Sequence, residues 1–145
     1  MNYRFREMKI KDYNEFINLW KNCEGINLDE TDDYESIKIY LKRNPQLCHV
    51  NLYKGIIIGA IKCGQDGRRG YLHHLAVKKD FRNRGIGKTL VKLCLLNLVK
   101  QSIKKCNIFV LKNNENGQIF LKNNNWNKLE EYYYTLQKKI NKDKI

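Results

Sequence analysis

The sequence predicts a mixed α+β fold in which helices cover both faces of a mostly antiparallel sheet. Short segments with strand-like patterns alternate along the chain with longer segments whose apolar residues recur at helical spacing. The chain has 145 residues, of which 42% are hydrophobic and one is proline. That length is typical of one domain and suffices to bury a core without disulfides or a metal. We therefore expect a single domain over residues 1–145.

An edge strand and two helices are predicted in the first third of the chain. Tyr3–Arg6 alternates apolar and polar residues, and Tyr13–Trp20 has apolar residues at the spacing of one helical face. A second helix is expected over Asp33–Arg43, because acidic residues mark its start and Pro45 lies just beyond its end.

Three strands are predicted in the middle of the chain. Leu47–Lys54 and Ile56–Cys63 are joined at a turn that contains Gly55, and Tyr71–Val77 follows a second turn over Gly67–Gly70. Consecutive strands joined by short turns pair antiparallel, so these segments predict a meander.

The last third is predicted to form two helices and two strands. A long helix is expected from Gly85 to about Ser102, because its apolar residues fall on one face and several lysines on another. Ile108–Leu111 is expected to be a short buried strand, and Gly117–Asn123 a helix. Tyr132–Gln137 alternates in the manner of a closing strand.

The charge balance is strongly basic. The chain has 28 Lys and Arg against 15 Asp and Glu, which gives a formal net charge of +13. Such an excess can neutralise phosphates, but the basic residues are dispersed and no aromatic residues are interleaved with them as in RNA-binding motifs. We therefore expect a solvated basic surface rather than a nucleic-acid interface.

The cysteines and the N-terminus indicate a cytoplasmic protein. The five cysteines are odd in number and contain no C-x-x-C pair, which favours reduced thiols over disulfides or a metal site. The first residues lack the apolar region of a signal peptide, and no apolar run is long enough to span a membrane.

A glycine-bearing turn into the long helix is the sharpest motif of the chain. Backbone N–H groups at a helix N-terminus have no intrahelical partner, so such a turn is suited to phosphate. The Walker A pattern fails because Arg82 stands where a glycine is required, and the Rossmann pattern fails at Leu90. A third pattern, R/Q-x-x-G-x-G/A, is met by Arg82, Gly85 and Gly87.

This loop, together with the strand before it, resembles the pyrophosphate loop of the Gcn5-related N-acetyltransferase (GNAT) superfamily. The resemblance rests on residues 64–91, which read GQDGRRGYLHHLAVKKDFRNRGIGKTLV, and is closest to a subgroup of small bacterial GNAT enzymes. It implies the GNAT fold, with a sheet of six or seven strands that splays open after the fourth. It also implies acetyl-CoA as co-substrate and direct acetyl transfer to a primary amine, on a small molecule or a protein, in a ternary complex. The alternative is an acyl-CoA-binding module with little or no turnover.

The resemblance also assigns residues to the cofactor. The fourth strand would pair with the pantetheine arm, and the backbone N–H of Leu75 would polarise the thioester carbonyl. Asn114 would contact the pantetheine, cap the last helix, or do both. The residues implied at the arm and the pyrophosphate are Leu75, Ala76, Val77, Arg82, Asn83, Arg84, Gly85, Ile86, Gly87 and Lys88.

The usual acid and base of the family are missing. Leu121 stands where many members have a tyrosine acid, and the glutamate base falls at Tyr71 or Phe109. By elimination the candidate bases are His73 and His74, although a strand histidine is more often structural.

Adjacent strand residues point to opposite faces, so we expect only one of these two histidines to face substrate and no metal site between them. The tyrosines of the closing strand, Tyr134 among them, are candidate acids. Proton transfer through water, with proximity and carbonyl polarisation supplying much of the rate, is equally open.

The acceptor side contains a local acidic segment over residues 29–35. It can attract a cationic amine, or it can cap the following helix through Asp32 and Glu35 as a capping box, and capping is favoured. These residues do not assign the amine acceptor to one class of molecule. The chain is expected to be a monomer or a homodimer.

Overall fold

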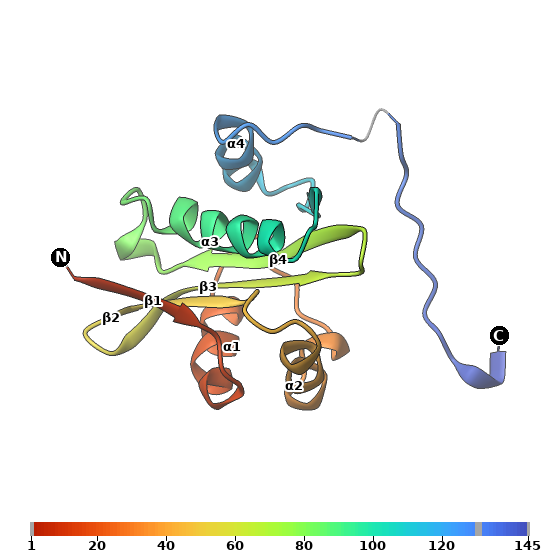
Figure 1. The fold of residues 1–145 in the computed structure, drawn as a ribbon, viewed down its shortest axis with the longest axis horizontal. Helices are drawn as coiled ribbons and strands as arrows, with labels where there is room; N and C mark the ends of the chain where they lie inside the picture. Colours follow the sequence, from red (N-terminus) through yellow and green to blue (C-terminus); the bar gives the residue numbers. More distant parts are fainter. Residues whose placement is uncertain (1, 130–131, 145) are drawn as a thin grey trace.

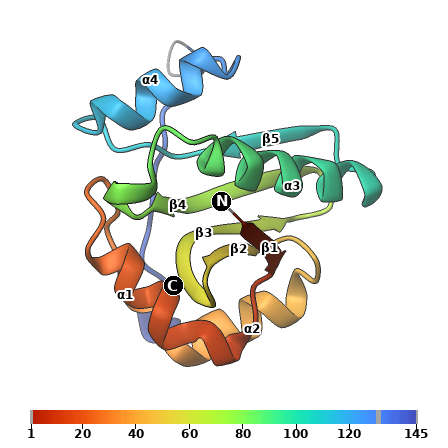
Figure 2. The same cartoon turned by 90° about the vertical axis from the view of Figure 1, so that its left-hand side faces the viewer.

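The sheet of the protein has five strands in the part of the chain that a computed structural model describes, residues 2–129 and 132–144. The strands stand in sequence order from β1 to β5, with the first four antiparallel (Figure 1) and β5 parallel to β4 (Figure 2). Their bounds are Tyr3–Glu7 for β1, His49–Tyr53 for β2, Ile56–Gln65 for β3, Arg69–Val77 for β4 and Lys105–Ile108 for β5. The mostly antiparallel sheet is confirmed, with five strands instead of six or seven.

Helices cover both faces of the sheet, as predicted. Figure 2 shows α1 and α2 on one side of the strands and α3 with α4 on the other. The helices are α1 Tyr13–Lys21, α2 Tyr34–Arg43, α3 Ile86–Lys100 and α4 Glu115–Asn123. Short 3₁₀ turns stand at Ile10–Asp12 (η1), Glu30–Asp32 (η2), Lys79–Phe81 (η3) and Lys142–Lys144 (η4). No helix within the described residues is long and apolar enough to cross a membrane.

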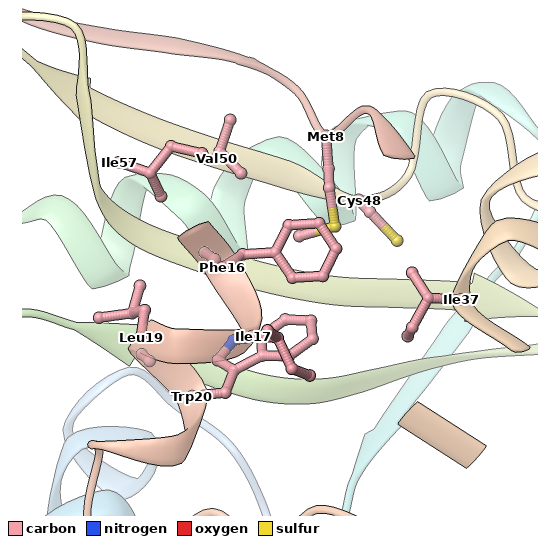
Figure 3. Close-up of a cluster of buried hydrophobic side chains, with 11 residues drawn as sticks. Met8, Phe16, Ile17, Leu19, Trp20, Ile37, Cys48, Val50 and Ile57 are labelled. Atoms are coloured by element: carbon pink, nitrogen blue, oxygen red, sulfur yellow. The ribbon is translucent and has the colours of Figure 1, made fainter. Parts of the chain in front are cut away.

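Two aromatic side chains of α1 stand in the core on the α1–α2 face. Phe16 and Trp20 of α1 are fully buried, and their rings lie 4.9 Å apart, centroid to centroid. Ile37 of α2 joins them against Val50 and Ile57 of the sheet (Figure 3). The apolar residues of α1, predicted from their spacing to form one helical face, are therefore the face that is buried.

Aliphatic side chains from α3 form the core on the opposite face. Leu90, Cys94 and Leu98 are buried against Ile61 and Leu72 of the two central strands. Neighbouring residues of β3 face opposite sides of the sheet, so that Ala60 belongs to the α1–α2 core and Ile61 to the α3 core. The α3 helix is thereby fixed across β4, with its N-terminus beside the end of that strand.

The strands β4 and β5 separate before β4 ends. Their pairing covers Arg69–Leu72 of β4, whereas β4 continues to Val77 with β3 as its neighbour. The edge of β4 that faces β5 is therefore without a strand partner over its last five residues, 73–77. The splay that the family resemblance implies is present.

A bulge interrupts β4 at the start of this open edge. Ala60 pairs with Ala76 and Lys62 with His73, so that His74 and Leu75 of β4 stand opposite the single residue Ile61. His74 has a φ of +54°, which is uncommon for a residue other than glycine. A bulge changes the direction of the side chains next to it, so His73 and His74 need not point to opposite faces of the sheet.

Two predicted strands are wrong. The strand expected at Ile108–Leu111 lies earlier, at Lys105–Ile108. Pairing with β4 ends at Ile108, so the apolar residues that follow it are outside the sheet. The closing strand expected at Tyr132–Gln137 is irregular, and its residues are exposed. Alternation shows only that a segment suits a strand, and it does not supply the neighbouring edge that pairing needs.

The α3 core contacts predict a large difference between two leucines of the same helix. Leu98→Ala removes a side chain that is 2% exposed, whereas Leu96→Ala removes one that is 48% exposed. We expect Leu98→Ala to lower the free energy of unfolding by about 2–5 kcal/mol and Leu96→Ala to change it by less than about 1 kcal/mol. Urea unfolding followed by circular dichroism measures both, and equal losses would contradict the packing described.

Candidate active site

A cleft with a volume of about 240 Å³ opens where β4 and β5 separate. Its walls are the open end of β4, the chain that follows β5, the loop after α1 and the N-terminal half of α4. The lining is largely apolar, with two histidines and one carboxylate among its polar groups. The residues are Glu24, Gly25, Ile26, Asn27, His73, His74, Leu75, Ile108, Phe109, Val110, Leu111, Asn114, Gly117, Phe120 and Leu121.

The N-terminus of α3 lies next to this cleft. Gly85 has a φ of +79° and precedes the helix, and the first backbone hydrogen bond of the helix runs from Thr89 N–H to the Gly85 carbonyl. The N–H groups of residues 86–88 therefore have no intrahelical acceptor and carry the positive end of the helix dipole. A Cβ on Gly87 would lie 3.6 Å from the ring of Phe120, which lines the cleft.

The arginines of the loop are held by protein groups. Arg82 donates from Nε to the Val77 carbonyl at 2.9 Å and forms an ion pair with Glu24. Arg84 donates from Nη1 to the Tyr3 hydroxyl at 3.1 Å. Both contacts fix the loop onto the body of the domain, while the side chain of Lys88 is exposed beside the free N–H groups.

Asn114 is the N-cap of α4, as one of its two expected roles requires. Its Oδ1 accepts a hydrogen bond from Gly117 N–H at 3.0 Å. The loop after α1 reaches the same side chain, because a Cβ built on Gly25 would stand 2.4 Å from Asn114 Nδ2. Gly25 has a φ of +83°, so both its conformation and its surroundings require glycine.

Both histidines of β4 line the cleft, which corrects the expectation that only one faces it. Simple alternation fails because the bulge at His74 changes the side-chain directions of the strand. The ring centroids of His73 and His74 are 6.2 Å apart. Among the described residues, no group of three or more His, Cys, Asp or Glu side chains is arranged to hold a metal ion.

His74 is held by a buried pair of charges behind the cleft. Its Nε2 lies 3.0 Å from Asp32 Oδ1, and the same oxygen lies 2.9 Å from Lys62 Nζ. Asp32 and Lys62 are 4% and 7% exposed. Burial alone would raise the pKa of Asp32, but the hydrogen bonds from His74 and Lys62 and their charge hold that pKa well below its ordinary value. Asp32 is therefore ionised at neutral pH.

His73 has a different environment. Burial, with the nearby Lys62 and His74, lowers the pKa of His73 to about 4, so its ring is neutral at physiological pH. The ring stacks on Phe109 at a centroid distance of 6.3 Å. No hydrogen bond of the His73 ring is found within the described part of the chain.

The side chains at the family's usual acid and base positions are placed as follows. Leu121 is buried and lines the cleft, and Phe109 is 60% exposed at its edge. Tyr71 stacks on Phe109, outside the cleft lining. Tyr134, the candidate acid, is 94% exposed in the irregular C-terminal segment and belongs to no strand, and it is not among the residues that line the cleft.

The acidic segment caps helices, but not through the pair that was expected. Asp29 accepts from Thr31 N–H at the start of η2, and Asp33 accepts from Ser36 N–H at the start of α2. Asp32 points into the protein, toward His74 and Lys62. The contact between Asp32 and Lys62 has one indication in the sequence, because Lys62 stands within the apolar residues of β3 and a buried lysine needs a counter-charge.

The contact between the α1 loop and α4 predicts that two glycines respond unequally to alanine. Gly25 and Gly55 both have positive φ, but no atom lies within 4 Å of a Cβ on Gly55. We expect Gly55→Ala to lower the free energy of unfolding by about 1–2 kcal/mol through backbone strain alone. Gly25→Ala is expected to cost about 1 kcal/mol more, since it also displaces the Asn114 cap. Chemical unfolding measures the difference, and equal costs would refute the contact.

Comparison with known proteins agrees with this architecture. The family model described as Acetyltransferase (GNAT) family matches residues 13–124. An acetyltransferase of Yersinia enterocolitica is 32% identical over 110 residues, which are 76% of this chain and 77% of that protein. An acetyltransferase of Sodalis glossinidius is 31% identical over 110 residues, with the same shares covered.

Solved structures have the same fold at lower identity. The PaiA N-acetyltransferase of Thermoplasma acidophilum, solved in complex with coenzyme A, superposes with a TM-score of 0.74 at 21% identity, over 86% of this chain and 89% of that one. AAC(6')-Iy, solved with a bisubstrate analogue, gives a TM-score of 0.76 at 14% identity, over 95% and 99% of the two chains. From the extent of the family match and the identity of the relatives, the chain belongs to the GNAT family of acetyltransferases.

Proposed function

We propose that this protein is an N-acetyltransferase that transfers the acetyl group of acetyl-CoA to a primary amine in a ternary complex. The observation that carries the proposal is the continuity of the open β4 edge with the free N–H groups at the N-terminus of α3. An unpaired strand edge can hydrogen-bond an extended amide-containing arm, and a helix N-terminus can bind its pyrophosphate. Acetyl-CoA contains both groups in that order.

The cofactor would lie along the cleft from its apolar end to the glycine turn. The pantetheine amides would pair with the backbone at residues 75–77, and Leu75 N–H would donate to the thioester carbonyl as negative charge develops on its oxygen. The pyrophosphate would accept from the N–H groups of residues 86–88, with Lys88 as the exposed cation beside it. Arg82 would serve by fixing the loop, because its guanidinium is already paired with Glu24.

His74 is the proposed general base. The acceptor ammonium would give one proton to the imidazole of His74, and the free amine would attack the thioester carbonyl carbon. The C–S bond then breaks, the nitrogen loses its second proton to the CoA thiolate, and the imidazolium returns its proton to solvent. The products are an N-acetyl amine, CoA and one proton.

Geometry and charge favour His74 over His73 for this role. His74 has a carboxylate that orients its ring, in the arrangement by which general bases are commonly held. The pKa of His73, about 4, makes it too weak a base to deprotonate an ammonium efficiently at neutral pH. A stacked contact with Phe109 suits His73 to shaping the wall of the cleft.

A second candidate function is an acyl-CoA-binding module with little turnover. It is favoured by the side chains at the usual acid and base positions, because Leu121 and Phe109 have no titratable group and Tyr71 is not among the residues that line the cleft. The two functions share the cofactor site and differ in acceptor-dependent release of CoA.

Acetyl-CoA is expected to stabilise the protein in a saturable way that requires Gly85. At about 100 times its dissociation constant the ligand adds ~2.7 kcal/mol, enough to raise Tm by several degrees. Gly85→Val strains the loop at a φ of +79° and should abolish the rise. Gly67→Val strains a turn outside the cleft, at a φ of +92°, and should retain it. Differential scanning fluorimetry gives both results, and no rise for the unmodified protein at millimolar acetyl-CoA would refute cofactor binding.

Substitution of the two histidines is expected to separate their roles. We expect His74→Gln to lower kcat by about 10²–10⁴-fold, the range for loss of a general base, and His73→Gln to lower it much less. The assay measures thiol released from acetyl-CoA over a panel of polyamines, aminoglycosides, amino acids and peptides with a free N-terminus. Binding of acetyl-CoA without release by any amine would support the binding module instead.

A further inference from the structure

The buried pair Asp32 and Lys62 is unusual in a protein whose other charges are mostly at the surface. Asp32 belongs to η2, between the two helices on one face of the sheet, whereas Lys62 stands in the apolar strand β3. Burial of two charges is costly, and replacement by apolar side chains is often neutral or stabilising. Because this costly pair lies in contact with a cleft histidine, we looked for a role of the pair in the chemistry of that histidine.

We infer that Asp32 and Lys62 are positioning residues that orient the His74 ring through Nε2 and leave its Nδ1 as the proton acceptor. The inference rests on the proposed function, since it concerns the base of that reaction. Asp32 would set the tautomer of the ring, and Lys62 would balance the charge of Asp32.

The hydrogen bonds assign the tautomer. Asp32 is ionised and can only accept, so the His74 nitrogen 3.0 Å from Oδ1 must carry a hydrogen. In a neutral imidazole the other nitrogen, Nδ1, then has the lone pair. Asp32 itself is fixed, because its Oδ2 accepts from Asp29 N–H at 3.2 Å and its backbone carbonyl accepts from the Tyr13 hydroxyl at 2.7 Å.

The two buried charges next to His74 are of opposite sign. The negative charge of Asp32 favours the imidazolium, which cannot act as a base, and the positive charge of Lys62 on the same oxygen opposes that effect. Lys62 is held in place by the ring of Tyr40, 5.1 Å from Nζ to the centroid.

The remaining titratable neighbours of His74 leave this balance intact. His73 is neutral at physiological pH, and Glu24 at the loop after α1 is paired with Arg82. The Tyr13 hydroxyl donates to a backbone carbonyl, and Trp20 offers an uncharged ring 5.1 Å away, centroid to centroid. The pair of Asp32 and Lys62 is therefore the controlling charge couple within the described residues.

Opposite shifts of one titration test the inference. In Lys62→Met the unbalanced carboxylate should move the midpoint of the His74 titration to higher pH, by about one pH unit or more. In Asp32→Asn the unbalanced ammonium should move it to lower pH, and the Nε2–H tautomer should lose its dominance. The double variant Asp32→Asn with Lys62→Met removes both charges and should titrate between the two single variants.

The measurement is ¹H–¹⁵N NMR of the histidine rings over pH 4–9, in the protein without ligand. The chain has three histidines, and the signals lost in His74→Gln assign those of His74. Asp33→Asn and Lys38→Met remove exposed charges from the same region and should leave the titration unchanged. Each single substitution leaves one buried charge unpaired and is expected to lower stability whatever the role of the residue, so unfolding is measured separately. If a single variant does not fold, the titration of the double variant is compared with that of the unmodified protein.

The outcomes separate this inference from the proposed function. An Nε2–H tautomer in the unmodified protein, with midpoint shifts of opposite sign, supports it. An Nδ1–H tautomer, or shifts that are absent or of equal sign, would overturn it. The titration needs neither acetyl-CoA nor an acceptor, so a failure of turnover leaves its result standing. Where an acceptor is found, the acidic limb of the pH–rate profile should move in the same two directions, and kcat of Asp32→Asn should fall at least about tenfold.

Discussion

The structure depends on the early end of the pairing between β4 and β5. A strand with neighbours on both sides offers no backbone groups to a ligand, whereas β4 beyond Leu72 has β3 on one side and the cleft on the other. The α3 helix is fixed by its core leucines across the same strand, so its N-terminus stands where β4 ends. One gap in a sheet thereby places a strand edge, a helix terminus and an apolar cavity side by side.

The second determinant is a polar layer behind that cleft. The bulge brings both histidines of β4 to the cleft, and the buried pair from η2 and β3 reaches His74 from the core side. In the proposed reaction His74 is linked through Asp32 to η2, beside α1 and α2, while the thioester would lie along the open edge of β4. The base and the cofactor would then be positioned by different parts of the fold.

Much of the fold follows from local sequence patterns, and the site follows only in part. All four helices were predicted within a few residues of their bounds, from helical spacing in α1 and α3 and from the acidic start and Pro45 in α2, and the glycine turn at Gly85 marked the N-terminus of α3. Pairing partners are not encoded locally, which is why the apolar run after Ile108 and the tyrosines near Tyr134 were wrongly predicted as strands. The bulge depends on the register between β3 and β4, and the link from Asp32 to Lys62 joins residues 30 positions apart, so no single-segment pattern contains either of them.

Backbone hydrogen–deuterium exchange with and without acetyl-CoA, read by mass spectrometry, tests whether the cofactor occupies the open edge of β4 and the first turn of α3. We expect added protection over residues 75–77 and 86–88, with β1 and β2 unchanged. Protection confined instead to the hollow of about 450 Å³ that Arg4, Tyr53 and Lys54 line, at the β1–β2 edge of the sheet, would contradict this placement.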